Sequence, residues 1–328
     1  MAIEIPAFAD VVAAARRIAP YAVRTPLVEA PQLSAATGAR VFLKLENLQR
    51  TGSFKFRGAC NRILMIPEAD RARGVVAFSS GNHAQGVAAA AQIFGIPALI
   101  VMPVDAPKAK IAGTRVYGAE IVPYDRVKDD REAIAARICA ERGATLIKPY
   151  DDPGIMAGQG TIGLEIAEDA ARFGVALDAV ATPCSGGGLV SGVALALKGA
   201  GVSAPVHSVE PENFDGMKRS LAAHARTNAP GGKLSIADAL MAPVPGHHVF
   251  ALADGLLAPG IAVDDEELAR AVAFAALRLK LLVEPGGGAA LAALLSGKLK
   301  GGTVALVVSG GNADFASVEN AVFRYPDV

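Results

Sequence analysis

A single lysine, Lys55, stands between Phe54 and Phe56, directly after a Thr51-Gly52 turn. Apolar flanks remove water from an ammonium group and lower its pKa, which is how proteins prepare an amine for Schiff-base chemistry. The structural alternative is a surface lysine whose stem lies along two core rings. The heptapeptide Ser53–Ala59 does not by itself decide between them, so the choice depends on which other groups the chain supplies.

A run of three glycines, Ser185-Gly186-Gly187-Gly188-Leu189, follows an apolar strand pattern and precedes a helical pattern. Glycines let backbone N–H groups converge on an anion, and the N-terminus of a helix adds a favourable dipole. The run matches neither the Walker pattern nor the G-x-G-x-x-G spacing of dinucleotide sites, so the predicted ligand is a single phosphate. A tight turn without a ligand is the structural alternative.

Two polar turns also follow predicted strands. Ser79-Ser80-Gly81-Asn82-His83 offers groups that can bind a carboxylate or a phenolic oxygen, although Ser80 or Asn82 could simply cap a helix. Ser309-Gly310-Gly311-Asn312 ends the last predicted strand, and open α/β sheets bind ligands at the carboxyl ends of their strands. A further glycine-rich turn at 283–288 is interpreted equally as packing or as ligand contact.

These turns require a scaffold of alternating strands and helices, and the hydrophobic pattern predicts one. The alternation over 74–150, repeated from about residue 158, indicates parallel sheets covered on both faces. Strands are predicted at 41–46, 75–78, 98–102, 120–123, 145–148, 179–181, 206–209 and 303–308. Helices are predicted at 8–19, 56–64, 84–94, 108–117, 131–142, 158–173, 188–198, 264–277 and 286–295.

Composition limits the class of protein. The 328 residues, 52% of them hydrophobic and 20% charged, suffice for two domains with large cores. The formal net charge is zero and the basic residues are scattered, which argues against a nucleic-acid or membrane partner. Cys60, Cys139 and Cys184 lie far apart, and residues 1–6 lack the features of a secretory signal. Both observations favour a cytoplasmic protein with reduced thiols.

In their order along the chain, these motifs resemble those of the fold type II pyridoxal-phosphate enzymes. The likeness is greatest to the threonine dehydratase (ammonia-lyase) and serine racemase family, in the short form without a regulatory domain. The matching motifs are Ser53–Ala59, Ser79–Gln85, Ala157-Gly158-Gln159-Gly160-Thr161, Ser185–Leu189, Val283–Gly286 and Ser309–Asn312.

The resemblance implies an α/β fold of the tryptophan synthase β type, with two open, twisted parallel-sheet domains and helices on both faces. The large, discontinuous domain would comprise residues 1–65 and 152–328, and the small, mobile domain residues 73–150. The cofactor, pyridoxal 5′-phosphate, would bind in the cleft between them.

The resemblance also implies a role for each motif. Lys55 would hold pyridoxal phosphate as a Schiff base and later move the α-proton of the substrate. Phe54 would pack on the cofactor ring, Asn82 would bind its 3′-oxygen, and Ser309 would face the pyridine nitrogen. The phosphate would bind at Ser185, Gly186, Gly187, Gly188 and Leu189, and the substrate carboxylate at Ser79, Ser80, Gly81, Asn82 and His83.

Two implied roles bear on the reaction. A serine such as Ser309 does not keep the pyridine nitrogen protonated as a carboxylate would, so loss of a β-leaving group is favoured over transamination. Ser80 matches the serine that reprotonates the opposite face in racemases of this family, but dehydratases carry it too. Arg131 stands where racemases place a substrate-loop arginine, and a solvated helix face is the preferred interpretation.

Relatives often bind a divalent cation through a glutamate, a carbonyl four residues later and an acidic residue two further. Glu210 and Phe214 match the first two positions. Gly216 stands at the third, with Asp215 one residue early. The resemblance therefore leaves a Mg²⁺ or Mn²⁺ site at Glu210 open.

The sequence thus predicts a homodimeric or homotetrameric ammonia-lyase that converts L-threonine or L-serine to a 2-oxo acid and ammonia. Serine racemase and a dehydratase of 3-hydroxyaspartate or another β-hydroxy amino acid are the alternatives within the family. A ligand-binding α/β protein without catalysis is the alternative from another class, and loss of Lys55 would be its expected mark. A nicotinamide oxidoreductase is disfavoured because no G-x-G-x-x-G motif is present.

Overall fold

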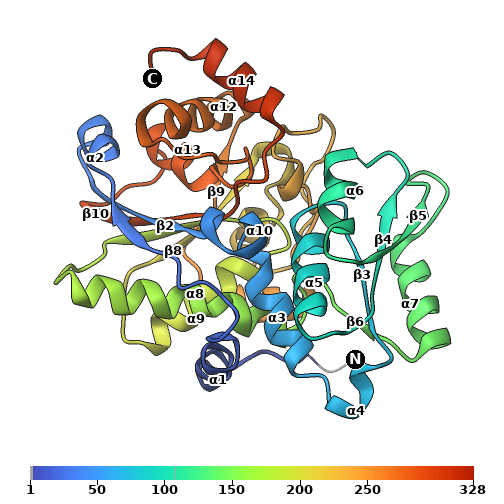
Figure 1. Cartoon of the computed structure of the whole chain (residues 1–328). Helices are drawn as coiled ribbons and strands as arrows, with labels where there is room; N and C mark the ends of the chain where they lie inside the picture. The colour runs from blue at the N-terminus through green and yellow to red at the C-terminus, as the bar shows by residue number, and fades with distance from the viewer. Residues whose placement is uncertain (1–2, 107) are drawn as a thin grey trace.

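The computed structural model describes residues 3–106 and 108–328, which form two β-sheets flanked by helices (Figure 1). The strands are β1 (Leu27–Glu29), β2 (Arg40–Leu45), β3 (Val75–Phe78), β4 (Ala98–Pro103), β5 (Glu120–Tyr124), β6 (Thr145–Leu146), β7 (Ala179–Pro183), β8 (Val206–Pro211), β9 (Ile261–Val263) and β10 (Thr303–Val308). The larger sheet has the order β1-β2-β10-β7-β8-β9 and the smaller β5-β4-β3-β6. Only β1, paired with β2, runs antiparallel to its neighbour among these strands.

Fourteen α-helices lie among the described residues. They are α1 (Phe8–Ile18), α2 (Pro31–Thr37), α3 (Lys55–Leu64), α4 (Glu68–Arg71), α5 (Asn82–Ile93), α6 (Lys108–Arg115), α7 (Arg131–Arg142), α8 (Pro153–Arg172), α9 (Gly188–Gly199), α10 (Gly216–Ala223), α11 (His247–Ala253), α12 (Asp265–Phe274), α13 (Ala289–Leu295) and α14 (Phe315–Arg324). Short 3₁₀ turns are η1 (Glu46–Leu48), η2 (Arg50–Gly52), η3 (Glu212–Phe214) and η4 (Asp238–Leu240), and a π-helical turn is η5 (Ala275–Leu279). Within the described part of the chain, no helix has the length and apolar character needed to span a membrane.

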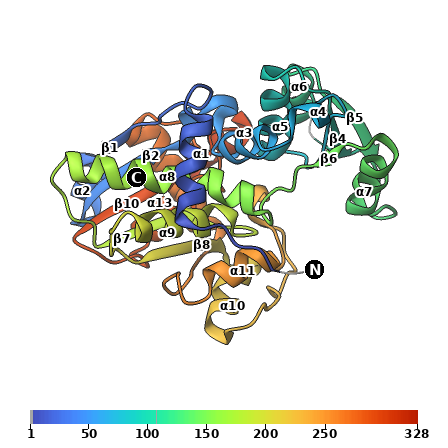
Figure 2. The same ribbon diagram turned by 90° about the horizontal axis from the view of Figure 1, so that it is seen from below.

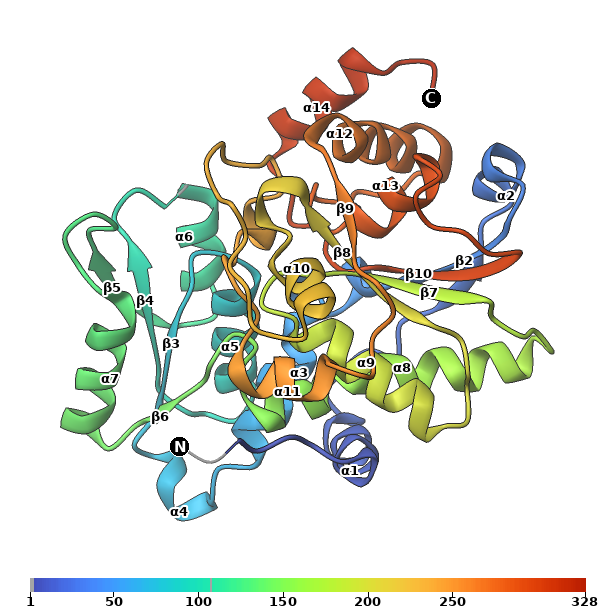
Figure 3. The ribbon, with the colours of Figure 1, turned by 180° about the vertical axis from the view of Figure 1, so that it is seen from behind.

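The larger sheet is covered on both faces, as its continuous apolar strands predict. On one face, Leu268 of α12 and Leu291 of α13 belong to the core. On the other face, Ile166 of α8 and Val193 of α9 do so. Figures 1 and 3 show these two pairs of helices on opposite sides of β10 and β7. The predicted doubly covered parallel sheet is therefore confirmed.

The smaller sheet and its helices α5, α6 and α7 form a separate lobe, seen from below in Figure 2. One face packs against α5 and α3, and Phe56 and Ile63 of α3 lie in that core. The other face packs against α7 through Ala135 and Ile138. Because α3 shares the core of the smaller sheet, it joins the two lobes. The domain limits proposed from the sequence stay a prediction.

The structure departs from the expected elements mainly where signals are short. Helix α8 begins at Pro153, five residues before the predicted start, because Asp152 caps it: its Oδ1 accepts the N–H of Ile155 at 3.0 Å. The sequence analysis did not predict β1, β9, α2, α4, α10, α11 and α14. Strands of three residues, as β1 and β9 are, carry too little periodicity to be recognised.

Two glycines let α3 and α8 cross closely. A methyl group on Gly158 would lie 2.7 Å from the Cα atom of Gly58 and 2.9 Å from the carbonyl oxygen of Arg57. Both are backbone atoms, which cannot move aside as a flexible side chain can. The crossing therefore fixes α3, whose first residue is Lys55, against the long helix of the larger domain.

We predict that Gly158→Ala lowers the free energy of unfolding by about 1–3 kcal/mol, because overpacking outweighs the gain in helix propensity. Denaturant unfolding of the purified protein measures this loss. Gly113→Ala on α6 is the matched control, because its methyl group would meet only the flexible end of Gln85, at 3.3 Å. Equal stability of the two variants would show that the crossing is not tightly packed.

Candidate active site

A cavity of about 340 Å³ lies between the two lobes. It is bordered by the turns that follow β3, β7 and β10 and by the first residue of α3. The predicted site residues that line it are Phe54, Lys55, Ser79, Ser80, Gly81, Asn82, His83, Ser185, Gly186, Gly187, Gly188, Leu189 and Ser309. Lys55 and Ser309, 254 positions apart in the sequence, thus share one cavity, while the roles of these residues stay predictions.

The turn that presents Lys55 is held against the end of β10. Thr51 and Gly52 adopt the left-handed conformation, with φ of +63° and +70°. Ser53 then pairs with Gly310, and the N–H of Phe54 donates to the carbonyl oxygen of Ser309 at 3.1 Å. This pairing places the lysine next to the serine predicted to face the cofactor ring.

The Lys55 side chain is partly buried where it lines the cavity. Its Nζ donates to the carbonyl oxygen of Pro149 at 2.6 Å and lies 5.2 Å from the centre of the Phe54 ring. No carboxylate in the described part of the chain pairs with it. Burial lowers the pKa of Lys55 to about 8. An amine with that pKa is an effective nucleophile and base near neutral pH.

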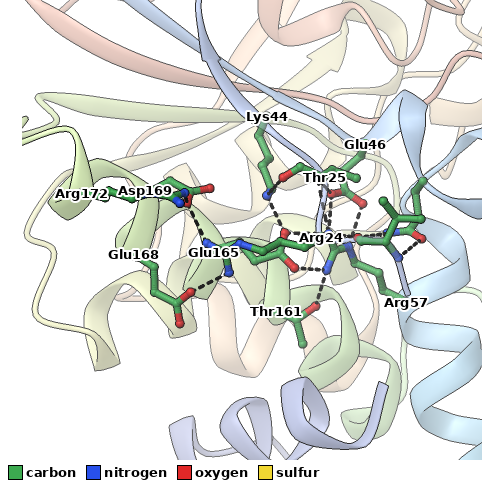
Figure 4. A network of polar contacts seen from close by, with 12 residues as sticks. Arg24, Thr25, Lys44, Glu46, Arg57, Thr161, Glu165, Glu168, Asp169 and Arg172 are labelled. Carbon is green, nitrogen blue, oxygen red and sulfur yellow. Dashed lines mark hydrogen bonds and ion pairs between the residues drawn. The ribbon is translucent and has the colours of Figure 1, made fainter. Parts of the chain in front are cut away.

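A buried polar network lies beside the first turn of α3 and contacts it through Arg57 (Figure 4). Arg57 donates to Glu46 on η1 and to Glu165 on α8, at distances of 2.7–2.8 Å. Lys44 on β2 donates to the same Glu165 at 2.5 Å. Although burial by itself lowers the pKa of Arg57, the two carboxylates outweigh it and raise the pKa. Because Arg57 lies two residues after Lys55, this network holds the helical turn from which the lysine projects.

The lowered pKa of Lys55 predicts a pH-dependent stability for the cofactor-free protein. The folded-state pKa of about 8 lies below the value of 10.5 for the free side chain. Between these values the unfolded chain binds one more proton, so the free energy of unfolding rises as the pH rises through this window. The full effect is roughly 3 kcal/mol. Urea unfolding at pH 7.5 and pH 10 measures it as the difference between wild type and Lys55→Met. Identical pH slopes in the two proteins would contradict it.

The glycine turn has the features of a phosphate site. Gly187 adopts φ of +93° and caps α9, which has no side-chain cap. A methyl group on Gly186 would lie 2.4 Å from the Tyr150 ring, so only glycine fits there. Within the described residues, no acceptor binds the backbone N–H groups of Gly186, Gly187 and Gly188. Three free amides at a helix N-terminus suit a bound phosphate.

The turn between β3 and α5 presents Ser79 to His83 at the other side of the cavity. The N–H of Gly81 donates to Ser79 Oγ at 3.2 Å, and Nε2 of His83 lies 2.9 Å from the carbonyl oxygen of Ile147. Burial lowers the pKa of His83 to about 3, with a further contribution from Lys55. His83 is therefore neutral and positions the turn rather than supplying a positive charge.

The residues fit pyridoxal phosphate. A single cavity is bordered by the amine of Lys55, three free backbone amides and the hydroxyl of Ser309. The amine suits the aldehyde of that cofactor, the amides suit its phosphate, and the hydroxyl suits its pyridine nitrogen. Ser185 adds to the fit, since its Oγ accepts the N–H of Ala242 at 3.2 Å and so ties the turn to the segment that covers it.

Several cavity residues were not singled out from the sequence. Lys110, Arg126 and Asp238 line the cavity but belong to no recognisable motif. Arg126 pairs with Asp105 at 2.7 Å, and Lys110 pairs with Asp238 across the two lobes. Glu284 lies in the glycine-rich turn at 283–288, where its sequence signal is a carboxylate between an apolar run and three glycines.

The proposed metal residue Glu210 lies outside the cavity lining. Its two carboxylate oxygens accept the N–H groups of Met217 and Lys218, each at 2.8 Å, at the start of α10. Burial raises the pKa of Glu210 to about 8. Among the described residues, no three side chains of His, Cys, Asp or Glu gather as a metal site would require. A Mg²⁺ or Mn²⁺ ion at Glu210 stays a prediction that needs carbonyl or water ligands.

Comparison with known proteins agrees with this geometry. Residues 18–310 match the family described as pyridoxal-phosphate dependent enzyme. An L-threo-3-hydroxyaspartate ammonia-lyase from Pseudomonas sp is 44% identical over 95% of this chain and 97% of that protein. A threonine deaminase of known crystal structure, from T.th., is 44% identical with a TM-score of 0.89, covering 94% of this chain and 99% of that one. Maize serine racemase is 35% identical with a TM-score of 0.91, covering 99% of both chains.

Proposed function

Because this chain belongs to the family of pyridoxal-phosphate-dependent enzymes, we propose that it is an ammonia-lyase acting on a β-hydroxy-α-amino acid, L-threonine or L-serine. The products are the 2-oxo acid and ammonia. Elimination releases one water molecule, and the final hydrolysis consumes one. One observation carries the proposal: an amine of lowered pKa lines the same cavity as a turn of three glycines and a serine, not a carboxylate, at the end of β10.

Pyridoxal phosphate, when bound, supplies the electron sink that stabilises negative charge at the substrate α-carbon. Lys55 takes the α-proton on Nζ, since its pKa of about 8 leaves a substantial neutral fraction near pH 8. The turn Ser79 to His83 binds the substrate carboxylate with hydroxyl and backbone N–H groups at the start of α5. Ser80 lines the same cavity, and we propose that it donates or accepts a proton on the other side of the substrate.

Ser309 favours elimination over transfer reactions. Its hydroxyl donates a hydrogen bond but carries no charge that would keep a ring nitrogen protonated. Negative charge at the α-carbon is then stabilised less strongly, so prompt departure of the β-hydroxyl is favoured over a long-lived carbanion. The backbone of Ser309 is fixed at both ends, because its N–H donates to Gly287 and its carbonyl oxygen accepts from Phe54.

The proposal is tested by an absorption spectrum of the purified protein followed by addition of L-threonine, L-serine or L-threo-3-hydroxyaspartate. We expect a cofactor band in the near-visible region and formation of a 2-oxo acid and ammonia in equal amounts. Chiral analysis of recovered serine measures the racemase alternative. A protein that binds no pyridoxal phosphate, or that binds it and converts none of the three amino acids by elimination or racemisation, would contradict the proposal.

A specific observation favours 3-hydroxyaspartate as a second candidate substrate. Arg131, at the start of α7, lines the cavity with its guanidinium 5.5 Å from the ring of Phe78, the residue before Ser79. Among the described residues no carboxylate pairs with it, whereas the cavity cations Lys110 and Arg126 each have one. An arginine left free beside the substrate turn can bind a second substrate carboxylate.

We predict that Arg131→Gln lowers kcat/KM for hydroxyaspartate about 10- to 100-fold, mainly through a higher KM, because one charge-assisted contact is lost. The kcat/KM for threonine should change less than about threefold. Steady-state assays of both substrates measure this. Arg126→Gln is the matched control, since Arg126 is already paired with Asp105. Equal losses on both substrates would assign Arg131 a structural role instead.

We also propose that the protein is a cytoplasmic homodimer or homotetramer. Large apolar side chains are exposed on the single chain, among them Phe315 and Phe323 of α14, with exposed fractions of 75% and 85%. A second subunit would cover such surface. Light scattering during size-exclusion chromatography gives the subunit number, and a monomer at micromolar concentration would contradict this proposal.

A further inference from the structure

Glu284 is a buried carboxylate that no step described above uses. It lies in the turn that precedes α13, lines the cavity and has an exposed fraction of only 6%. Gly310 makes room for it, because a methyl group there would lie 2.1 Å from Oε1 of Glu284. No cation in the described part of the chain forms an ion pair with it. A carboxylate buried in this way costs stability, which favours a functional role.

Among the described residues, the one side-chain hydrogen bond of Glu284 is with Asn82, a predicted cofactor ligand on the opposite lobe. Oε1 of Glu284 accepts a hydrogen bond from Nδ2 of Asn82 at 2.5 Å. Oδ1 of Asn82 accepts one from Nδ2 of Asn312 at 2.8 Å, and Asn312 also donates to the carbonyl oxygen of Thr51 at 2.7 Å. Both ends of the Asn82 amide are therefore held.

These contacts allow only one orientation of the Asn82 amide. Rotated by 180°, its oxygen would face the Glu284 carboxylate and its nitrogen would face the nitrogen of Asn312, so two attractive contacts would become repulsive. In the observed orientation, one N–H of Nδ2 is used by Glu284. The second N–H remains for a group in the cavity that Asn82 lines.

We propose that Glu284 is a positioning residue that fixes the Asn82 amide and thereby directs its free N–H to the phenolic oxygen of the cofactor. The inference rests on the proposed function, because it assumes that Asn82 contacts the cofactor. Glu284 touches neither substrate nor cofactor in this proposal and acts through Asn82.

Glu284 can perform this role in either protonation state. Burial raises the pKa of Glu284 to about 7, the Asn82 contact opposes this rise, and the nearby charges of Asp238 and Lys110 act in opposite directions. A protonated carboxyl group keeps an oxygen that accepts a hydrogen bond. The contact with Asn82 therefore persists on both sides of neutral pH.

The experiment is a double-mutant cycle read out by cofactor affinity and by the absorption spectrum of the reconstituted protein. Apo forms of wild type, Glu284→Ala, Asn82→Ala and the double variant are titrated with pyridoxal phosphate. We expect Glu284→Ala to weaken binding about 5- to 20-fold and to reduce the long-wavelength band, since an ionised phenolic oxygen loses its fixed donor. In a protein that already carries Asn82→Ala, the further change Glu284→Ala should weaken cofactor binding by less than about twofold.

Two further variants keep the result interpretable. Glu284→Gln preserves size and offers a carbonyl oxygen, so it should stay within about threefold of wild type even if the alanine variant folds poorly. Glu29→Gln removes a carboxylate that pairs with Arg40 outside the cavity lining, and it should leave the ratio of the absorption bands unchanged.

Three results would overturn the inference. The first is a wild-type affinity for pyridoxal phosphate in Glu284→Ala, and the second is a loss of affinity in Glu284→Gln as large as in the alanine variant. The third is a double variant whose loss of affinity equals the product of the losses in Glu284→Ala and Asn82→Ala. In each case the wild type still binds the cofactor, so the proposed function stands. A wild type that binds no pyridoxal phosphate would overturn both.

Discussion

Replacing Lys55 with alanine is expected to reduce turnover of any β-hydroxy amino acid by more than about 10⁴-fold, because in the proposed function one amine both holds the cofactor and moves the α-proton. No second amine is positioned to replace it: Lys110, the other lysine in the cavity lining among the described residues, is paired with Asp238. The near-visible absorption band that depends on a covalent amine should also be absent from the purified variant.

Parallel assays of 2-oxo acid formation and absorption spectra measure both effects. Lys198→Ala is the matched control, because Lys198 is an exposed lysine near the end of α9 that does not line the cavity, and it should retain wild-type activity and colour. Circular dichroism confirms that the Lys55 variant is folded. A folded, colourless Lys55→Ala protein with more than about one hundredth of wild-type activity would show that Lys55 is not the base.

Replacing Arg57 with methionine is expected to lower the free energy of unfolding by about 3–5 kcal/mol, the largest loss of stability among these predictions. The change leaves the carboxylates of Glu46 and Glu165 in the protein interior without their main counter-charge. Lys44 alone then remains for Glu165, and burial already lowers the pKa of Lys44. Uncompensated buried charges destabilise the folded state strongly.

Arg24→Ala is the matched control for this prediction. Arg24 also binds two carboxylates, those of Glu168 and Asp169, but its side chain is 48% exposed and Asp169 keeps its pair with Arg172. Such a partly exposed pair contributes about 0–1 kcal/mol. Chemical denaturation of both variants makes the comparison. If Arg57→Met and Arg24→Ala lose equal stability, the buried network of Figure 4 does not hold α3 in place.

Local features of the chain were sufficient to predict the elements that carry the site. The strands β3 and β10 were predicted with the bounds that the structure has, because each is a short apolar run ended by a polar or glycine-rich turn. The turns at Ser79–His83, at the three glycines and at Ser309 were recognisable for the same reason. Glycine and small polar residues are needed wherever a strand ends at a ligand.

Pairs that are distant in sequence were not predictable in this way. Lys55 donates to a carbonyl oxygen 94 residues away, Arg57 to a carboxylate 108 residues away, and Asn82 to one 202 residues away. Nothing in the residues around Glu284 indicates that its partner is an asparagine at the start of α5. Such pairs form only when two lobes meet, and many other pairings satisfy the same local pattern.

The amino-acid sequence by itself thus indicated the kind of chemistry and the turns proposed to perform it, because the predicted nucleophilic lysine, the predicted phosphate turn and the strand-end serine are each recognisable within a few residues. The tertiary structure decided the electrostatics of these groups. Burial of Lys55 lowers its pKa, and the contact with Glu284 fixes the orientation of Asn82. Both effects depend on which distant segments exclude water from the cavity or supply a partner there, and that is a property of packing rather than of local sequence.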